Sequence, residues 1–221
     1  MPAIEPELQA LRENLNDMLS MVKNQLEKCI EAIEKQDSDI AQKVLDDERK
    51  INIQELSIDR DCENILALFT PVATDLRSVL AALKITNDLE RIGDSAKSLA
   101  KVLLDGAGKK NYRWMEALKI VPMLEELVSM LKDMGNAMRK EDTKPALKAV
   151  KKDEVVNDYY KKAVKTTADL ILKNPDDGKS ILILFLMVRN LERSGDLTKN
   201  IAEEIVFQIE ARVLKHKGKK K

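Results

Sequence analysis

Leu89-Glu90-Arg91-Ile92-Gly93-Asp94 is the stretch that decides the fold, because it returns as Leu191-Glu192-Arg193-Ser194-Gly195-Asp196, 102 residues further along the chain. Each copy holds a Glu-x-x-x-Asp box inside a long segment with helical periodicity. One such box means little in a chain of 221 residues with 38 acidic ones. The shared Leu, Arg and Gly in the same order mean much more. We therefore interpret the chain as an internal duplication, in which any functional site should occur twice.

Composition supports a helical protein. Hydrophobic residues make up 44% of the chain and charged residues 34%, with only 7 Gly and 6 Pro, which is typical of long helices around a modest core. Aromatic residues, at 3%, are too few for a sheet protein or for base stacking. The formal net charge is zero, which removes the usual electrostatic reason to expect nucleic-acid binding.

Nothing in the sequence predicts secretion or membrane insertion. The longest apolar run, Ile181 to Val188, is far shorter than the ~18 residues of a membrane span. The N-terminus lacks a signal-peptide pattern, and the two cysteines, Cys29 and Cys62, have no metal-binding spacing. We expect a soluble, cytoplasmic protein. We interpret the lysine-rich tail, residues 215–221, as a disordered solubilising end, although it would also suit a membrane or nucleic acid.

Caps and breakers predict an all-α fold of six long helices, arranged as two tandem antiparallel three-helix bundles. The expected helices span about residues 5–35, 39–69, 71–105, 112–139, 145–173 and 174–213. Gly106-Ala107-Gly108 is the best boundary. The predicted domains are therefore residues 1–107 and 108–214, followed by the tail.

Folding each hairpin brings acidic residues together. If the second and third helices pair about a turn near Pro71, Glu48 faces Asp94 and Asn52 faces Glu90. In the second hairpin, Asp153 faces Asp196 and Asn157 faces Glu192. Opposed carboxylates repel each other, so a bound cation, flanking lysines or raised carboxyl pKa values must offset the cost.

An all-oxygen ligand set without a nearby His suits Mg²⁺, Mn²⁺ or iron better than structural zinc or copper. The only His is His216, in the tail. Because the acidic row of the third helix lies opposite its own core face, we expect a shallow, partly solvated site that can hold more than one ion. Lysines at the rim, such as Lys97 and Lys199, are the alternative source of positive charge.

Two further motifs complete a resemblance to a known family. Pro71-Val72-Ala73-Thr74-Asp75-Leu76-Arg77 precedes the first box, and Asn200-Ile201-Ala202-Glu203 follows the second. With both boxes, this pattern resembles the PhoU family of phosphate-uptake regulators over both halves of the chain. The resemblance implies two similar three-helix bundles and usually a homodimer. It also implies negative regulation of phosphate uptake and of the phosphate-starvation response, through a phosphate-specific ABC transporter ATPase and a sensor histidine kinase. Membrane association would then occur only through these partners.

Members of the family can carry multinuclear metal clusters on paired acidic motifs, so the resemblance also implies which residues would bind the metal. The first site would comprise Glu48, Asn52, Glu55, Asp59, Glu90 and Asp94; the second would comprise Asp153, Asn157, Glu192 and Asp196. Leu197 stands where family members often have His, and Tyr160 where an acid is expected. We therefore expect metal occupancy to favour the first site.

Three functions remain open at this point: a metal-binding regulatory adaptor without catalytic activity, a purely structural helical scaffold, and a carboxylate-metal enzyme. The enzyme is disfavoured because helical di-iron enzymes usually supply Glu-x-x-His ligands, and neither box contains His. A scaffold would not require acidic residues in matching register. We therefore favour the adaptor, with Fe, Mn or Mg as its metal and no catalytic residues.

Overall fold

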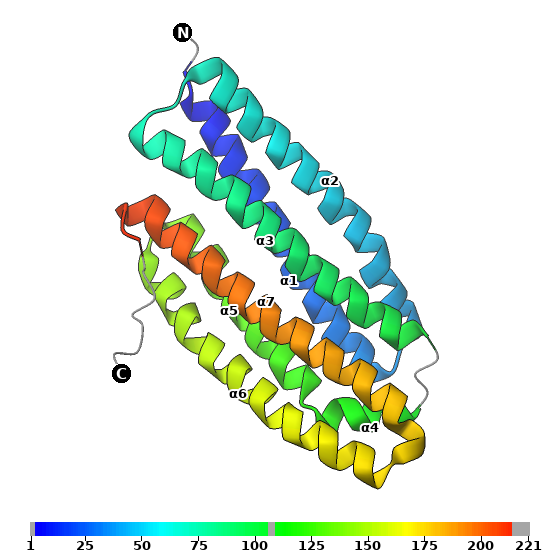
Figure 1. The fold of residues 1–221 in the computed structure, drawn as a ribbon. Coiled ribbons are helices and arrows are strands. Elements are labelled where there is room, and N and C mark those ends of the chain that lie inside the picture. Colours follow the sequence, from blue (N-terminus) through cyan, green and yellow to red (C-terminus); the bar gives the residue numbers. More distant parts are fainter. Residues whose placement is uncertain (1–2, 106–108, 214–221) are drawn as a thin grey trace, which may run out of the picture.

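The computed structural model describes residues 3–105 and 109–213, and over these ranges the chain is all-α, as predicted (Figure 1). It contains long helices, one short helix and a single 3-10 turn. In chain order they are α1 (Glu5–Lys35), α2 (Ser38–Phe69), α3 (Ala73–Leu104), α4 (Lys109–Ala117), α5 (Ile120–Lys140), α6 (Thr143–Lys173), η1 (Pro175–Asp177) and α7 (Gly178–Glu210). The helices α5 to α7 repeat the arrangement of α1 to α3.

The duplication is visible in the turns. In each half, the first helix ends at a left-handed residue, Gln36 or Glu141, and an Asp caps the second helix. The side chain of Asp37 accepts a hydrogen bond from the backbone N–H of Asp39 at 2.8 Å. Asp142 accepts one from Lys144 at 3.0 Å. These caps satisfy backbone donors that the first turn of a helix leaves free.

The second half departs from the predicted helix limits. The expected helix over residues 112–139 is two helices, because Lys119 adopts a left-handed conformation with φ 59° between α4 and α5. The last helix ends at Glu210, before the predicted residue 213. The proposed boundary at Gly106-Ala107-Gly108 and the tail over 215–221 lie outside the described residues.

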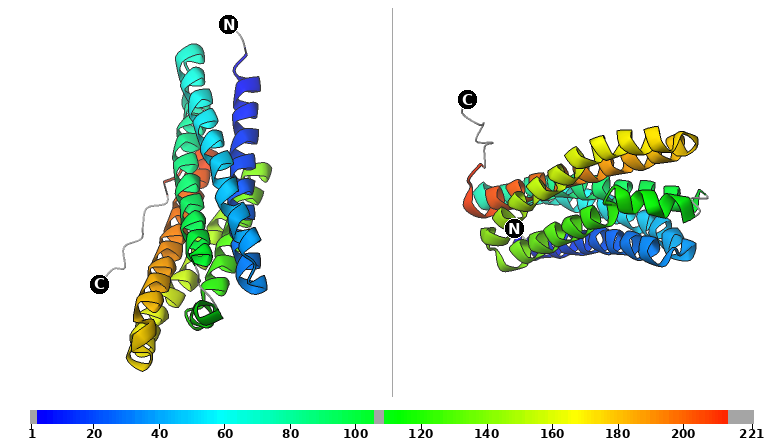
Figure 2. Two further views of the ribbon diagram at one scale, coloured as in Figure 1. Left: turned by 90° about the vertical axis from the view of Figure 1, so that its right-hand side faces the viewer. Right: turned by 90° about the horizontal axis from the view of Figure 1, so that it is seen from below.

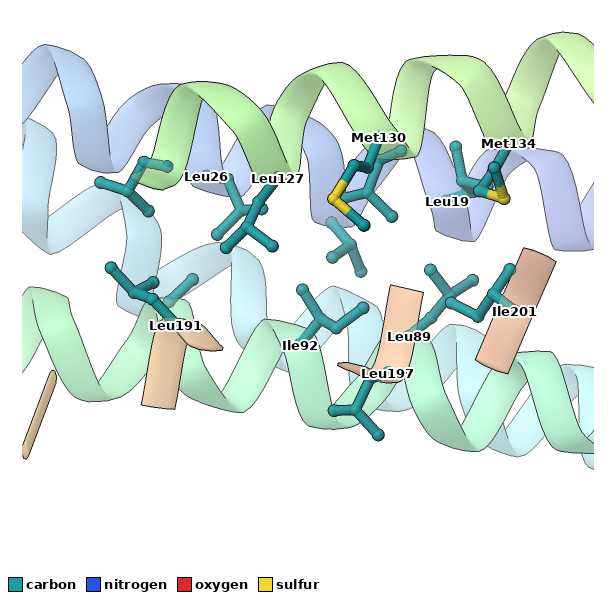
Figure 3. Close-up of a cluster of buried hydrophobic side chains, with 14 of the residues drawn as sticks. Leu19, Leu26, Leu89, Ile92, Leu127, Met130, Met134, Leu191, Leu197 and Ile201 are labelled. Atoms are coloured by element: carbon teal, nitrogen blue, oxygen red, sulfur yellow. The ribbon is translucent and has the colours of Figure 1, made fainter. Parts of the chain in front are cut away.

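The two halves share one core. Helix α2 packs on α1 and α3, and α6 packs on α5 and α7, while α1 contacts α5 and α3 contacts α7. Figure 2 shows the long helices running side by side along one axis. Figure 3 shows buried side chains from four helices in one cluster: Leu19 and Leu26 (α1), Leu89 and Ile92 (α3), Leu127, Met130 and Met134 (α5), and Leu191, Leu197 and Ile201 (α7). The predicted neighbouring bundles are therefore joined through a continuous hydrophobic interior.

This packing leaves α2 and α6 on the outside of the molecule, each resting on the third helix of its own half. The acidic residues of the two predicted sites, which we call the acidic rows, lie along the α2–α3 and α6–α7 contacts. None of the described helices combines the length and hydrophobicity that a membrane span requires.

Candidate metal centre

Three carboxylates meet where α2 packs on α3. One oxygen from each of Glu48, Glu90 and Asp94 lies within 4.8 Å of the other two. Glu48 is only 3% exposed, whereas the Asp94 side chain is 52% exposed. Two oxygens bound to one cation can be no farther apart than twice the metal–oxygen distance, which is about 4 Å for Mg²⁺ and about 5 Å for Ca²⁺. The three side chains are therefore close to the spacing of a single coordination sphere.

Helix α1 holds the buried carboxylate in place. Gln25 donates from Nε2 to the Val44 carbonyl at 3.1 Å and to Glu48 Oε2 at 3.3 Å. Gln25 is fully buried, and its Oε1 has no hydrogen-bond partner. Gln25 is not among the site residues predicted from the sequence, although a Gln between the apolar Val22 and Leu26 was a signal for it. The site is consequently deeper on its α2 side than the shallow groove that we expected.

The glycine of each box makes room for the facing polar side chains. A Cβ on Gly93 would lie 3.2 Å from Gln25 Oε1 and 3.5 Å from Glu48 Oε2. A Cβ on Gly195 would lie 2.9 Å from Asp153 Oδ1, which is closer than real Cβ contacts allow. A helical Gly costs ~1 kcal/mol relative to Ala, so the close approach of these side chains explains its presence twice.

The cluster holds more negative charge than its protein neighbours neutralise. Lys97 donates to Glu48 Oε1 at 3.3 Å and to Asp94 Oδ1 at 3.1 Å, and it is the one cation paired with these three carboxylates in the described structure. Burial, followed by repulsion from Asp94, Glu55 and Glu48, raises the pKa of Glu90 to about 7. Burial and the neighbouring Asp59 and Asp94 also raise the pKa of Glu55.

The other predicted ligands of the first site follow along α2. Asn52 lies one turn after Glu48, and its Oδ1 is buried without a hydrogen-bond partner. Glu55 is half-buried and interacts electrostatically with Glu48 and Asp94. Asp59, another turn along, influences Glu55 but lies outside the group of three. Asn52 and Glu55 thus extend the oxygen-lined surface beside the cluster.

The second half repeats the pairing of acidic residues between two helices, but fewer of its carboxylate oxygens lie close to one another. Asp153 is 3% exposed and accepts a hydrogen bond from Asn157 Nδ2 at 3.1 Å, and its Oδ2 lies 3.8 Å from Lys199 Nζ. Its Oδ1 is buried without a partner. Burial, and then Asp196, raise the pKa values of both Asp153 and Glu192. Within the described ranges, however, the group of three carboxylates occurs only in the first half.

A local substitution also removes one acidic residue from the row in the second half. Tyr160 occupies the α6 position that Glu55 occupies in α2, seven residues after the buried acid. Its ring stacks on Phe185 of α7, with ring centroids 6.0 Å apart. An aromatic pair therefore replaces a carboxylate at one end of the second site.

Comparison with known proteins identifies the family. The PhoU domain matches residues 15–103 and 120–205, once in each half. The chain is 31% identical over 214 residues to the phosphate-specific transport system accessory protein PhoU homolog of Pseudomonas aeruginosa, covering 96% of this chain and 87% of that protein. It is 30% identical over 213 residues to the homolog of Aquifex aeolicus, covering 95% and 94%.

Solved structures agree. The crystal structure of PhoU from Pseudomonas aeruginosa superposes with a TM-score of 0.87 at 28% identity, covering 95% of this chain and 100% of that one. The phosphate transport system regulatory protein PhoU from Streptococcus pneumoniae superposes with a TM-score of 0.83 at 26% identity, covering 96% and 100%. The chain therefore belongs to the PhoU family.

Proposed function

We propose that this member of the PhoU family is a non-enzymatic accessory regulator of phosphate transport, with a cation-binding centre at Glu48, Glu90 and Asp94. The observation that carries the metal proposal is the approach of three carboxylate oxygens to within 4.8 Å with a single lysine to neutralise them. Oxygen ligands of this kind suit Mg²⁺, Mn²⁺ or iron. The names of its relatives support the regulatory role.

The buried polar atoms favour a bound cation over neutralisation by lysine alone. A buried oxygen without a partner is costly, by about 1–3 kcal/mol. Asn52 in the first half and Asp153 in the second each leave one such oxygen beside the acidic row. A metal ion would satisfy these oxygens, which Lys97 and Lys199 do not. In a purely structural scaffold they would be left without compensation.

A carboxylate-metal enzyme fits the residues less well. The cluster has no His ligand, and His216, the single His in the sequence, lies in the tail. A nucleophile–His pair or a Glu-x-x-His di-iron site cannot be assembled from the boxes. The centre is therefore proposed to stabilise the α2–α3 hairpin and shape its surface for partners.

Elemental analysis of the purified protein tests the metal proposal. The variant Glu90→Gln with Asp94→Asn should lose most of the bound Fe, Mn or Mg, because it removes two of three charges while keeping side-chain shape. The matched variant Glu192→Gln with Asp196→Asn changes the corresponding residues of the second half, and should lose less metal. A wild-type protein that binds no metal after growth and reconstitution with these ions would refute the proposal.

We propose further that the chain acts in the cytoplasm as a homodimer, and as a negative regulator of the phosphate-starvation response. It would link a phosphate-specific ABC transporter to a sensor histidine kinase. A phosphate-starvation reporter in a strain lacking the protein tests this: wild type should restore repression in high phosphate, and the double variant of the first site should restore it less. Co-purification with the transporter ATPase and the kinase separates loss of a partner from loss of metal. Full complementation without either interaction would contradict the adaptor role.

A further inference from the structure

The outward face of α6 is strongly basic. Seven lysines but only three acids are exposed on this helix. Five of those lysines form no ion pair within the described structure: Lys144, Lys151, Lys162, Lys165 and Lys173. At 100° per residue these five lysines fall within about 80° of arc around the helix axis, and this arc also holds the exposed Asp158 and Asp169, which leaves a net charge of three positive charges there. A 31-residue helix is about 46 Å long. We refer to these five lysines as the basic face.

The corresponding helix of the first half lacks this charge. On α2, four cations and three acids are exposed: Lys43, Arg49, Lys50 and Arg60, with Asp39, Asp46 and Glu63. The excess on exposed positions is thus four positive charges on α6 and one on α2. Because the whole chain has no net charge, the basic face reflects a local concentration of lysine and not a generally basic protein.

Aliphatic side chains accompany the lysines. Val155 is 41% exposed and lies between the basic residues of successive turns, and Leu172 near the helix end is 81% exposed. The exposed positions of α6 carry no aromatic residue on which a nucleic-acid base could stack. A helix face with an excess of lysines over acids, mixed with aliphatic residues, matches a lipid surface, where the ammonium groups meet phosphates and the aliphatic groups enter the headgroup layer.

The chain also leaves the described structure beside this helix. Glu210, the last residue of α7, accepts a hydrogen bond from Thr143 Oγ1, at the start of α6, at 2.6 Å. The sequence that follows contains five further lysines within residues 215–221. The end of α7 therefore lies at the N-terminal end of the basic face.

We propose that the basic face of α6 docks directly on an anionic lipid bilayer surface. The resemblance to the family implies membrane association only through protein partners; the basic face adds a contact with the lipid itself. Asp153 lies on the opposite side of α6, so lipid contact leaves the acidic rows accessible. Lipid binding by the basic face does not require the metal centre, so stripping the metal should not change it.

Co-sedimentation of the full chain with lipid vesicles tests the proposal. The protein should bind vesicles of phosphatidylcholine and phosphatidylglycerol in equal parts, but not vesicles of phosphatidylcholine alone. Binding should weaken steeply with salt, because the screening length falls from about 10 Å at 0.1 M to about 3 Å at 1 M. The variant Lys151→Glu, Lys162→Glu, Lys165→Glu should lower the partition coefficient at least about tenfold.

The duplicated helix supplies the matched control. Lys43→Glu, Arg49→Glu, Arg60→Glu makes the same change in net charge on α2 and should leave binding within about twofold. The neutral set Lys151→Gln, Lys162→Gln, Lys165→Gln should give an intermediate loss, and circular dichroism checks that each variant is folded. Equal losses in the α2 and α6 sets would overturn the proposal. So would an absence of vesicle binding, or a full loss on removing residues 214–221 while the α6 variants bind normally.

Discussion

Glu90 shows how the carboxylate cluster changes the ionisation of a single residue. Burial and three neighbouring carboxylates raise its pKa from 4.5 to about 7. Between these values the folded protein binds a proton at Glu90 that the unfolded chain does not. Glu90 therefore favours the folded state more at low pH, and this contribution is lost as the pH rises through about 7. A bound cation would take over the role of the proton.

We predict that the melting temperature of chelator-treated protein falls between pH 5 and pH 8 more steeply than that of a Glu90→Gln variant. Saturating metal should remove most of this difference in the wild type. Thermal denaturation monitored by circular dichroism across this range provides the measurement, with Glu63→Gln on the exposed side of α2 as the control. Parallel profiles for wild type and Glu90→Gln would show that Glu90 is not protonated in the folded state.

The two box glycines should respond differently to alanine. At Gly195 a Cβ would meet Asp153 Oδ1 at 2.9 Å and the branched Val156 at 3.3 Å, so Gly195→Ala should destabilise by about 1–3 kcal/mol despite the better helix propensity of Ala. Gly93→Ala should cost less, since the nearest atom belongs to the flexible end of Gln25. Urea unfolding measures both changes. Gly178→Ala, with its nearest neighbour at 3.7 Å, serves as the neutral control. A stabilising Gly195→Ala would contradict the proposed crowding.

The meeting of Glu48 with Asp94 could be predicted from sequence, because a turn of known position fixes which residues of an antiparallel hairpin lie opposite each other. Gln25 could not be found in this way. It lies on the first helix, and its approach to Gly93 depends on how α1 is rotated against the hairpin. Sequence periodicity indicates which face of a helix is apolar, but not which polar residue of that face contacts a neighbour.

At the scale of helices, the two halves have an ion pair at matching positions, but the helices that carry the positive and the negative charge are exchanged. Lys28 of α1 pairs with Asp47 of α2, and Asp133 of α5 pairs with Lys152 of α6 at 2.6 Å. Each pair spans 19 residues, yet the two charges have changed places. Both pairs link the first and second helices of a half, so either order of charges can favour the same register.

Most helix limits followed from caps and prolines, whereas the break at Lys119 did not. Leu118-Lys119-Ile120 contains no residue that favours a left-handed backbone. The available signal was Pro122, which lies in the first turn of α5, where a missing N–H is tolerated. A proline within the predicted helix should have indicated a new helix start a few residues earlier.

Lys119→Gly should stabilise the protein by about 0.5–1 kcal/mol, since Gly adopts a positive φ without the steric cost that a Cβ imposes. Lys119→Pro should destabilise it, because the proline ring fixes φ near −65° and removes the N–H that donates to Glu116. Urea denaturation distinguishes the two changes. A destabilising Lys119→Gly would mean that the lysine side chain compensates for its backbone conformation.

At the scale of the whole molecule, the halves depend on each other. Leu89 and Ile92 of α3 are fully buried, as are Leu127 and Met130 of α5 in the other half. Figure 3 shows all four in the same cluster. Hydrophobic periodicity predicts that such residues are buried, but not whether the covering helix comes from the same half. Sequence therefore predicted two bundles correctly as repeats, without revealing that their contact is part of the core.

A shared core predicts one cooperative unfolding transition. Trp114, the only tryptophan in the chain, lies in the second half and is 5% exposed, so its fluorescence reports on that half while far-UV circular dichroism reports on all helices. Leu26→Ala, a change in α1 of the first half, should destabilise by about 2–5 kcal/mol. It should shift the urea midpoints of both signals equally, whereas Leu68→Ala, at a 73% exposed position, should shift neither. If Leu26→Ala moves the dichroism midpoint and leaves the Trp114 midpoint in place, the halves unfold independently and the shared core does not couple them.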